Sequence, residues 1–442
     1  MVVGKIFERF IQLVATLKRA RTSPYFGFVK GADYLSQEEL LRIQALVGKD
    51  DPEVTSEFEN AFARLVGSGE SVAYASARMA FFDLMLSLGV GKDDEVILPG
   101  ATCSVMVNAV LRVGATPIFA DIDPDTFGSS HVEIEKKITH RTRMIVAQHS
   151  FGIPCSIERI VLLAKSRKIF LLEDCALTLG STVNGKKVGT FGDASLFSTD
   201  HSKPLSTLTG GLVYTSDRSL VKRLRKTRAN YPNLSASRQD ALFEKLVFEI
   251  NHCVPERYGK VELKNLIASV MRKILPTEGD FLIDDFGTSF DTRYPYPAKL
   301  PAFLATLGLI EVERWPLVSE ERKVLFSRIM SVVVNSRFGD NLPAAYSNST
   351  LVIVPLRFTW SHPHGAYVRE VIQGFTSSHL TWFLRPIVAT KEPLKNFKYQ
   401  LGSCPVSEAI GPKMINIPCN IPANQAEVLI SLLKKSFECA QN

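Results

Sequence analysis

The stretch that decides the fold is LLEDCALTLG at residues 171–180, continued by ASLFSTDHSKPLSTLTGG at residues 194–211. Its apolar start predicts a buried strand, and this strand runs into Glu173 and Asp174. In open α/β sheets, ligands bind beyond the carboxyl ends of the strands. Because buried carboxylates are costly without a cationic partner, these two residues predict a ligand site at this end of the sheet.

Lys203 follows in a turn rich in hydroxyl groups, with Ser198 and Ser202 before it and a Gly-Gly pair after it. A lysine in such a turn can form a Schiff base with an aldehyde, while hydroxyls and backbone donors hold a phosphate. Pyridoxal 5'-phosphate needs such a lysine, and a carboxylate such as Asp174 for its ring nitrogen. The spacing leaves two interpretations open, this cofactor site or a surface lysine in a serine-rich loop.

The flanking sequence alternates helical and strand-like patterns from about residue 55 to 215. This alternation is typical of a mostly parallel α/β organisation, and the continuous apolar strands indicate a sheet covered on both faces. The predicted strands are 71–75, 95–98, 117–120, 144–147 and 169–172, and the predicted helices are 57–66, 77–89 and 157–166.

The pattern changes over residues 229–290, which we interpret as an insertion with helices over 239–249 and 261–275. The sequence predicts an N-terminal lead-in (1–44), a large domain (45–315) that carries the insertion, and a smaller C-terminal α+β domain (316–442). The predicted elements of the last part are helices over 302–334 and 424–437 and strands over 351–355 and 414–417.

Composition excludes several classes of protein. Of the 442 residues, 45% are hydrophobic and 22% are charged, which is typical of a folded globular chain. The net charge of +7 is spread along the chain and does not predict nucleic-acid binding. The seven cysteines contain no CxxC pair, so neither a disulfide framework nor a metal site is expected, and a reducing, cytoplasmic location fits.

The N-terminus has an amphipathic helical pattern over residues 1–22, with Phe7, Phe10 and Val14 beside basic side chains. Glu8 and Arg9 interrupt what would be the core of a signal peptide. Two interpretations remain: a helix that packs on the body or on a partner subunit, and a basic helix that lies on a membrane surface. No apolar run reaches the ~20 residues needed to span a bilayer.

Several ordered motifs resemble those of the DegT/DnrJ/EryC1/StrS family of pyridoxal-phosphate-dependent sugar aminotransferases. They are EFENAFARLVGSG (57–69), GKDDEVILPGATCSVMVNAVLRVGATPIFADID (91–123), HSFGIP (149–154), LLEDCALTLG (171–180), FSTDHSKPLSTLTGG (197–211), CPVSEAI (404–410) and MINIPC (414–419). The resemblance covers about residues 45–437. It implies the aspartate aminotransferase-like fold (fold type I), with a large mostly parallel α/β/α domain and a smaller C-terminal α+β domain.

The resemblance also implies roles for individual residues. Lys203 resembles the lysine that binds the cofactor covalently, and Asp174 resembles the partner of its pyridine nitrogen. Ser76 lies at a helix start that favours an anion. The other interpretation is a plain N-cap, and capping and anion binding can coexist here. The residues that resemble phosphate contacts are Ser76, Ala77, Arg78, Ser198 and Ser202.

Three positions depart from the family pattern. Cys103 stands where an aromatic residue usually stacks on the cofactor ring, and Leu177 replaces a polar residue. Pro297 stands in the segment (296–299) that usually carries an asparagine for the phosphate of a neighbouring subunit. We expect these changes to alter the substrate or the rate while the chemistry of Lys203 and Asp174 is kept.

The resemblance implies transfer of an amino group from glutamate or glutamine to a keto sugar, carried by a nucleotide, in surface glycan or aminosugar biosynthesis. It further implies a homodimer. From its position just after the lysine segment, we expect the insertion at 229–290 to cover the sugar pocket or to extend the subunit interface. The alternatives are an inactive family member that acts as a binding scaffold, and another reaction of the same cofactor, such as sugar dehydration. Related dehydratases have histidine where this chain has Lys203.

Other candidates have two interpretations each. His149 is a substrate contact by family position or a hydrogen-bonded core histidine, and Cys175 is a small buried side chain rather than a nucleophile. Trp382 and Phe383 line a pocket or fill the small domain's core. His362 and His364 are expected to be solvated in a turn, because no other ligand-type residues accompany them.

Overall fold

The computed structural model describes residues 14, 31–261, 263–264, 267, 282, 284–373, 376, 383–421 and 425–438. The amphipathic helix predicted over residues 1–22, apart from position 14, and most of the helix predicted over 261–275 lie outside this set. Among the described residues, no helix combines the length and the apolarity needed to cross a bilayer.

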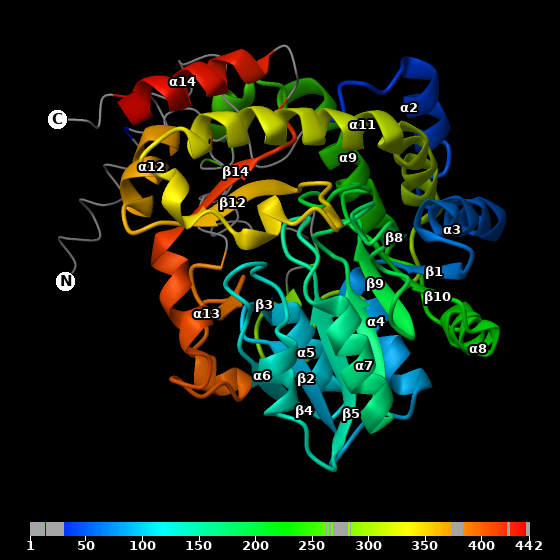
Figure 1. Cartoon of the computed structure of the whole chain (residues 1–442). Helices are drawn as coiled ribbons and strands as arrows, with labels where there is room; N and C mark the ends of the chain where they lie inside the picture. The colour runs from blue at the N-terminus through cyan, green and yellow to red at the C-terminus, as the bar shows by residue number, and fades with distance from the viewer. Residues whose placement is uncertain are drawn as a thin grey trace, which may run out of the picture.

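A seven-stranded sheet forms the centre of the larger part of the molecule, in the order β1-β10-β9-β6-β5-β2-β4 (Figure 1). The five strands from β9 to β4 are parallel, and β10 runs antiparallel to both of its neighbours. The predicted mostly parallel sheet is therefore confirmed. Its strands are β1 (Glu70–Tyr74), β2 (Glu95–Pro99), β4 (Thr116–Ala120), β5 (Thr142–Gln148), β6 (Phe170–Asp174), β9 (Ala194–Ser198) and β10 (Gly211–Thr215).

Helices cover both faces of this sheet. Successive strand residues point to opposite sides, and here the side chains of both faces are apolar and pack against helices. Ile97 packs in one apolar cluster with Ile160 of α7, whereas its neighbour Leu98 packs in another with Met79 of α4 and Val107 of α5. The helices of this part are α2 (Gln37–Gln44), α3 (Pro52–Val66), α4 (Ala77–Ser87), α5 (Ser104–Arg112), α6 (His131–Glu135), α7 (Ile157–Arg167), α8 (Arg218–Ala229) and α9 (Ala236–His252).

A second core lies in the C-terminal part, and the long helix α11 (Ala302–Val334) joins it to the first. Phe303 of α11 packs in the large core and Ile329 in the second. The second core also contains α12 (Gly365–Gln373), α14 (Ala426–Glu438) and the antiparallel pair β12 (Arg357–Ser361) and β14 (Met414–Pro418). The domain boundary at 315/316 would fall within α11, and it stays a prediction.

Short elements complete the chain. β3 (Thr102–Cys103) pairs with β13 (Ile387–Val388), and β7 (Thr182–Val183) pairs with β8 (Lys186–Lys187) and β11 (Leu351–Val352). The others are α13 (Pro405–Ile410) and the 3-10 turns η1 (Asp284–Phe286), η2 (Gly339–Asn341), η3 (Ala344–Ser347), η4 (Leu394–Phe397) and η5 (Gly411–Lys413).

Two predicted elements differ from the structure in length. The helix predicted over 57–66 already begins at Pro52, because the Asp51 side chain accepts hydrogen bonds from the N–H groups of Glu53 and Val54 and thereby caps it. The strand predicted over 351–355 is wrong beyond residue 352. There the Val354 N–H leaves the ladder and donates to the Ser181 hydroxyl.

Candidate active site

A cavity of about 490 Å³ lies where β5, β6 and β9 end, within the ~300–1,000 Å³ range of ordinary ligand sites. The carboxyl ends of parallel strands meet at one edge of a sheet, which brings together residues that are distant in sequence. All nine residues predicted for the cofactor line this one cavity: Ser76, Ala77, Arg78, Cys103, Asp174, Leu177, Ser198, Ser202 and Lys203.

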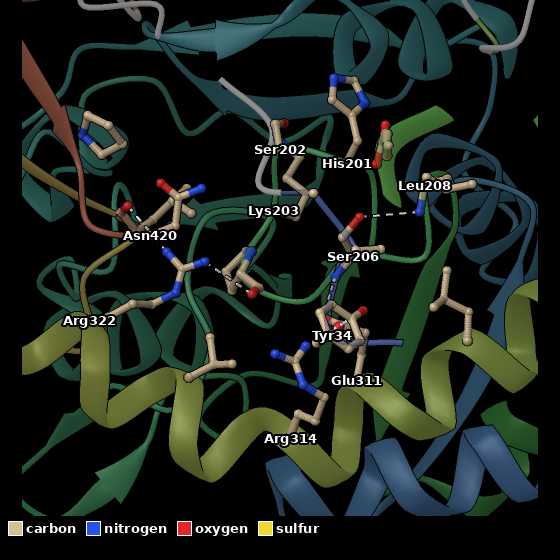
Figure 2. Close-up of a pocket in the computed structure, with 18 of the residues that line it drawn as sticks. Tyr34, His201, Ser202, Lys203, Ser206, Leu208, Glu311, Arg314, Arg322 and Asn420 are labelled. Atoms are coloured by element: carbon tan, nitrogen blue, oxygen red, sulfur yellow. Dashed lines mark hydrogen bonds and ion pairs between the residues drawn. The ribbon is translucent and has the colours of Figure 1, made fainter. Parts of the chain in front are cut away.

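Lys203 lies in the loop that follows β9, and its N–H donates to the carbonyl of Asp200 (2.9 Å). Figure 2 shows this loop with Ser202 and Lys203 above α11. Asp200 lines the same cavity and pairs with His201 (2.7 Å). Burial alone would raise the pKa of Asp200, but the charges of His201, Lys203 and Arg78 outweigh it and lower this pKa to about 2. No pattern in the sequence predicted this second carboxylate of the cavity.

Asp174 is the last residue of β6, and its carboxylate is almost fully buried in the wall of the cavity. Its Oδ1 accepts a hydrogen bond from the Ala176 N–H (2.9 Å). Burial raises the pKa of Asp174, and the Ala176 N–H and the charge of Lys203 offset this only in part. A buried carboxylate of this kind is stabilised by a protonated nitrogen placed against it.

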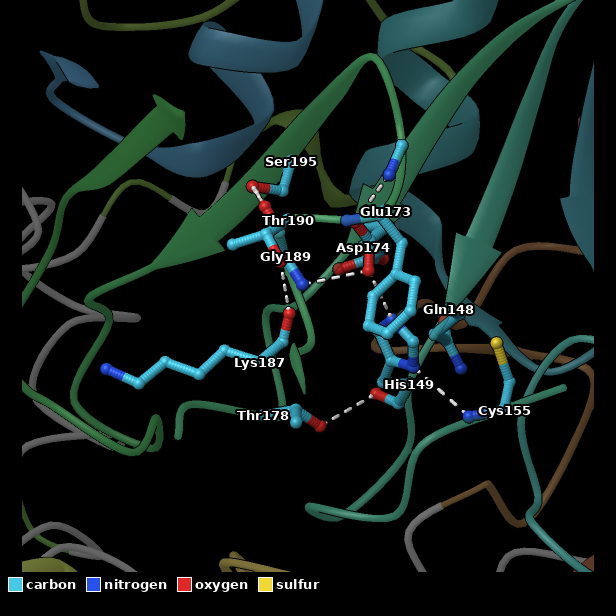
Figure 3. Close-up of polar contacts among 12 residues, drawn as sticks. Gln148, His149, Cys155, Glu173, Asp174, Thr178, Lys187, Gly189, Thr190 and Ser195 are labelled. Atoms are coloured by element: carbon cyan, nitrogen blue, oxygen red, sulfur yellow. Dashed lines mark hydrogen bonds and ion pairs between the residues drawn. The ribbon is translucent and has the colours of Figure 1, made fainter. Parts of the chain in front are cut away.

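Glu173 precedes Asp174 but serves a different purpose, because alternate residues of a strand face opposite sides. Its two oxygens accept the N–H groups of Gly189 (2.8 Å), Phe191 (2.6 Å) and Gly192 (2.8 Å), and it also contacts the His149 ring (3.1 Å). Figure 3 shows this network beside Asp174. Glu173 therefore fixes the chain segment before β9. Of the two carboxylates, Asp174 is the one that needs a cationic partner from a ligand.

The N-terminus of α4 forms the opposite wall. Ser76 stands at the N-cap position, but its hydroxyl makes no capping bond and, buried, has no hydrogen-bond partner among the described residues. The start of β10 packs closely against this helix start, since a Cβ on Gly211 would lie 2.3 Å from the Ala77 nitrogen. A buried, unpartnered hydroxyl at a helix start fits an anion such as a phosphate.

Arg78, in the first turn of α4, is held by a segment from the predicted insertion. Its Nε lies 2.6 Å from a carboxylate oxygen of Asp285, and both side chains are buried. Its guanidinium also donates to the Leu282 carbonyl and lies 5.3 Å from the centre of the Phe286 ring. Leu282 and Phe286 line the cavity, so the end of the insertion supplies part of its wall.

The two unusual residues of the cavity are apolar in character. Burial raises the pKa of the Cys103 thiol, which lies in β3 where this strand pairs with β13. Leu177 packs in a cluster with Phe383, which itself lines the cavity. Phe383 therefore lines the pocket and packs in a cluster separate from the second core, whereas Trp382 lies outside the described residues.

Sequence analysis also missed lining residues that other segments bring in, namely Gln148 and Arg385. Gln148 donates to the Ala101 carbonyl (3.0 Å), and Arg385 donates to the carbonyls of Ile387 (3.0 Å) and Glu392 (2.7 Å). Only the position of Gln148 at the end of a predicted strand could have signalled a site residue.

His149 does not line this cavity. Its Nδ1 accepts the Cys155 N–H (3.1 Å), so its proton is on Nε2 and is donated to Glu173. The structure thus gives it the contacts of a hydrogen-bonded core histidine, and a role as substrate contact has no support in the geometry. Cys175 lies within 4.8 Å of both groups, but the hydrogen bonds occupy the lone pairs that a metal ion would need.

The expectation for His362 is wrong. This side chain is buried against Phe338, and its Nδ1 accepts the N–H of His364 (3.0 Å). The turn closes on the second core, so packing rather than solvent surrounds the ring.

Comparison with solved structures identifies the fold. The structure is similar to that of the putative sugar aminotransferase Spr1654 from Streptococcus pneumoniae in its PMP form, with a TM-score of 0.70 and 20% identity, covering 95% of this chain and 100% of that one. This likeness shows the fold, and the predicted fold type I is confirmed.

Residues 43–251 match the model of the DegT/DnrJ/EryC1/StrS aminotransferase family. Over this segment the chain is similar to that family, which confirms the resemblance inferred from the motifs.

Two relatives are similar to parts of this chain. GDP-perosamine synthase from Escherichia coli O157:H7 is 45% identical over 166 residues, which are 38% of this chain and 46% of that protein. L-glutamine:2-deoxy-scyllo-inosose aminotransferase from Streptomyces lividus is 32% identical over 276 residues, 58% of this chain and 65% of that protein. The chain therefore spans about half the length of the first of these relatives and less than two thirds of the second.

Proposed function

We propose that this protein transfers an amino group from an amino-acid donor to a keto sugar, with pyridoxal 5'-phosphate as its cofactor. The observation that carries the proposal is the shared cavity of Lys203, Asp174 and the α4 N-terminus. The names of the relatives support the same reaction class. A nucleotide-linked keto sugar is the acceptor that we propose, with glutamate or glutamine as the donor.

The residues of the cavity fit this cofactor at each of its polar ends. The unpartnered Ser76 hydroxyl and the free N–H groups at the start of α4 suit its phosphate. The buried Asp174 carboxylate, with its raised pKa, suits the ring nitrogen. Ser198, Ser202 and Lys203 line the space between them.

When bound, the cofactor supplies an aldehyde that takes up amines reversibly and a ring that withdraws electrons from the amine-bearing carbon. Asp174 holds a proton on the ring nitrogen by its negative charge. Lys203 provides the amine that the donor displaces, and it then moves a proton to or from the substrate carbon as general acid and base. Leu177, Phe286 and Phe383 exclude water from this step.

The test uses the purified full chain with added pyridoxal phosphate. We expect an absorption band near ~400 nm, a borohydride-stable mass increase at Lys203, and loss of both in Lys203→Ala. Lys222→Ala is the control, since Lys222 is exposed on α8. Failure to bind the cofactor would instead favour the scaffold alternative. If the cofactor binds, assays with a panel of keto sugar nucleotides and with glutamate or glutamine would identify the substrates.

We also propose a homodimer, as the family resemblance implies. Sedimentation equilibrium of the full chain measures its mass directly, and a monomer at all concentrations would refute this part of the proposal.

A further inference from the structure

A second cavity, of about 410 Å³, lies at the amino end of the strands whose carboxyl ends form the first cavity. The first cavity contains Asp174, the last residue of β6, whereas the second contains Phe170, the first residue of this strand. At about 3.3 Å per residue, the strand places them about 13 Å apart. The two linings share no residue, so the second cavity can take a ligand of its own.

Hydrogen bonds fix one wall of the second cavity. The Asp193 N–H donates to the Leu171 carbonyl (2.9 Å), and the Leu171 N–H donates to Oδ2 of Asp193 (2.8 Å). The N–H groups of Phe191 (2.6 Å) and Gly192 (2.8 Å) donate to the Glu173 carboxylate. Because this wall is already in place, a ligand has to order little of the chain when it binds.

Three cations line the second cavity: Arg143 comes from β5, and Lys165 and Lys168 come from the end of α7. All three are exposed, and none forms an ion pair with a carboxylate that the structure describes. The neighbouring Arg167, by contrast, pairs with Glu135 (3.5 Å). Three unpaired cations from two elements match a doubly charged phosphate better than a single carboxylate.

The two lysines also have a simpler explanation, because cations near a helix C-terminus offset the helix dipole. The last carbonyls of α7 already accept backbone N–H groups, however, since Lys168 donates to Lys165 (3.2 Å) and Ile169 donates to Ala164 (3.0 Å). Arg143 belongs to a strand, so a helix dipole does not explain it. Arg143 is therefore the residue that most directly indicates an anion.

The rest of the lining is apolar except for Asp193. Phe170 and Phe191 are half-buried, and such rings offer a surface for a flat base. Lys186 already lies over the Phe191 ring (4.3 Å from its centre), so we assign the base contact to Phe170. Oδ1 of Asp193 accepts no hydrogen bond from the described residues, which leaves it for a sugar hydroxyl.

We propose that the second cavity binds a nucleoside monophosphate. Arg143 and the two lysines hold its phosphate, Phe170 contacts its base, and Asp193 accepts a ribose hydroxyl. A volume of about 410 Å³ suits a base, a ribose and one phosphate. A fatty acid matches the site less well, because its single charge leaves two cations and Asp193 without partners. This site does not depend on the proposed function.

Titration calorimetry of the full chain with adenosine 5'-monophosphate tests the proposal. We expect the wild type to bind this probe. Adenosine, which lacks the phosphate, and ribose 5-phosphate, which lacks the base, should each bind at least about tenfold more weakly. Arg143→Met should weaken binding of the monophosphate about tenfold, as for loss of one charge-assisted contact. Arg159→Met is the matched control, since Arg159 is exposed on α7 but lies outside the lining.

The first cavity can also accept a phosphate, so the binding has to be located. With the nucleotide present, amide exchange should slow at residues 168–171 and 191–193, and Ser76→Ala, at the first cavity, should bind the nucleotide like the wild type. If exchange slows only around residues 76–80 and 198–203 and Arg143→Met binds normally, the nucleotide lies in the first cavity and the proposal is wrong. Absence of binding by the wild type also overturns it. Equal affinity for ribose 5-phosphate would refute the base contact and with it the assignment to a nucleotide.

Discussion

Glu173 and Asp174 are consecutive residues of β6, yet one carboxylate holds the protein backbone and the other faces the cavity. Glu173 accepts hydrogen bonds from the N–H groups of Gly189, Phe191 and Gly192. Asp174 accepts one from its own turn and is left to a ligand. Because side chains alternate along a strand, Glu173 stabilises the fold and Asp174 faces the ligand site. We therefore expect the two amide substitutions to have opposite effects on stability.

Glu173→Gln should destabilise the protein by about 3 kcal/mol. The amide turns an acceptor oxygen into an NH₂ group that faces buried donors, which leaves them unsatisfied. Urea unfolding of the wild type and the variant measures this, and cofactor binding at a temperature where both are folded should stay within about threefold. Unchanged stability would show that the backbone network does not depend on this carboxylate.

Asp174→Asn should do the reverse. Because burial raises its pKa above the unfolded value, the folded chain binds more protons between the two values, and stability falls as the pH rises through this window. The amide removes the cost of a buried charge, so the cofactor-free variant should be more stable at pH 7 by roughly 1 kcal/mol. The difference should vanish below the unfolded pKa.

The same variant should lose at least about 100-fold in kcat, since an amide cannot hold the proton on the ring nitrogen. Thermal unfolding from pH 3 to 8 and the rate of amino transfer are the two measurements. Asp217→Asn, at the exposed start of α8, is the control. Lower stability of Asp174→Asn at neutral pH would contradict the assignment.

Ser76→Ala should weaken cofactor binding about tenfold without lowering stability. Ser76 makes no capping bond in the cofactor-free chain, so the folded state loses nothing with its hydroxyl. By contrast, Asp217 accepts two N–H groups at the start of α8, and Asp217→Ala should cost about 1 kcal/mol. Fluorescence titration with pyridoxal phosphate and thermal unfolding distinguish the two positions. A loss of stability in Ser76→Ala would mean that it is a plain N-cap.

Much of this site could be predicted from the sequence, because its key residues follow strands or begin a helix. Asp174 and Ser198 end apolar strands, and Ser76 precedes an apolar helix, so local patterns and motifs sufficed. Asp200 also lies in the predicted loop, beside His201 and Lys203. The sequence does not show that Arg78 from another segment adds to the charges that lower its pKa. The burial of the Arg322 side chain could not be predicted from the sequence, since only the packing of α11 against the Lys203 loop shows it.

The contact between Arg78 and Asp285 gives the last prediction. Asp285→Asn leaves the Arg78 guanidinium buried without its counter-charge, which should cost about 3–5 kcal/mol. Residues 284–292 should then exchange their amide hydrogens faster, because this contact fixes that segment to α4. Asp284→Asn is the matched control, since the neighbouring Asp284 pairs with the exposed Arg293 and should cost less than about 1 kcal/mol. If both variants exchange alike, the segment is held by other contacts, such as those of Asn108 with the carbonyls of Gly287 and Ser289.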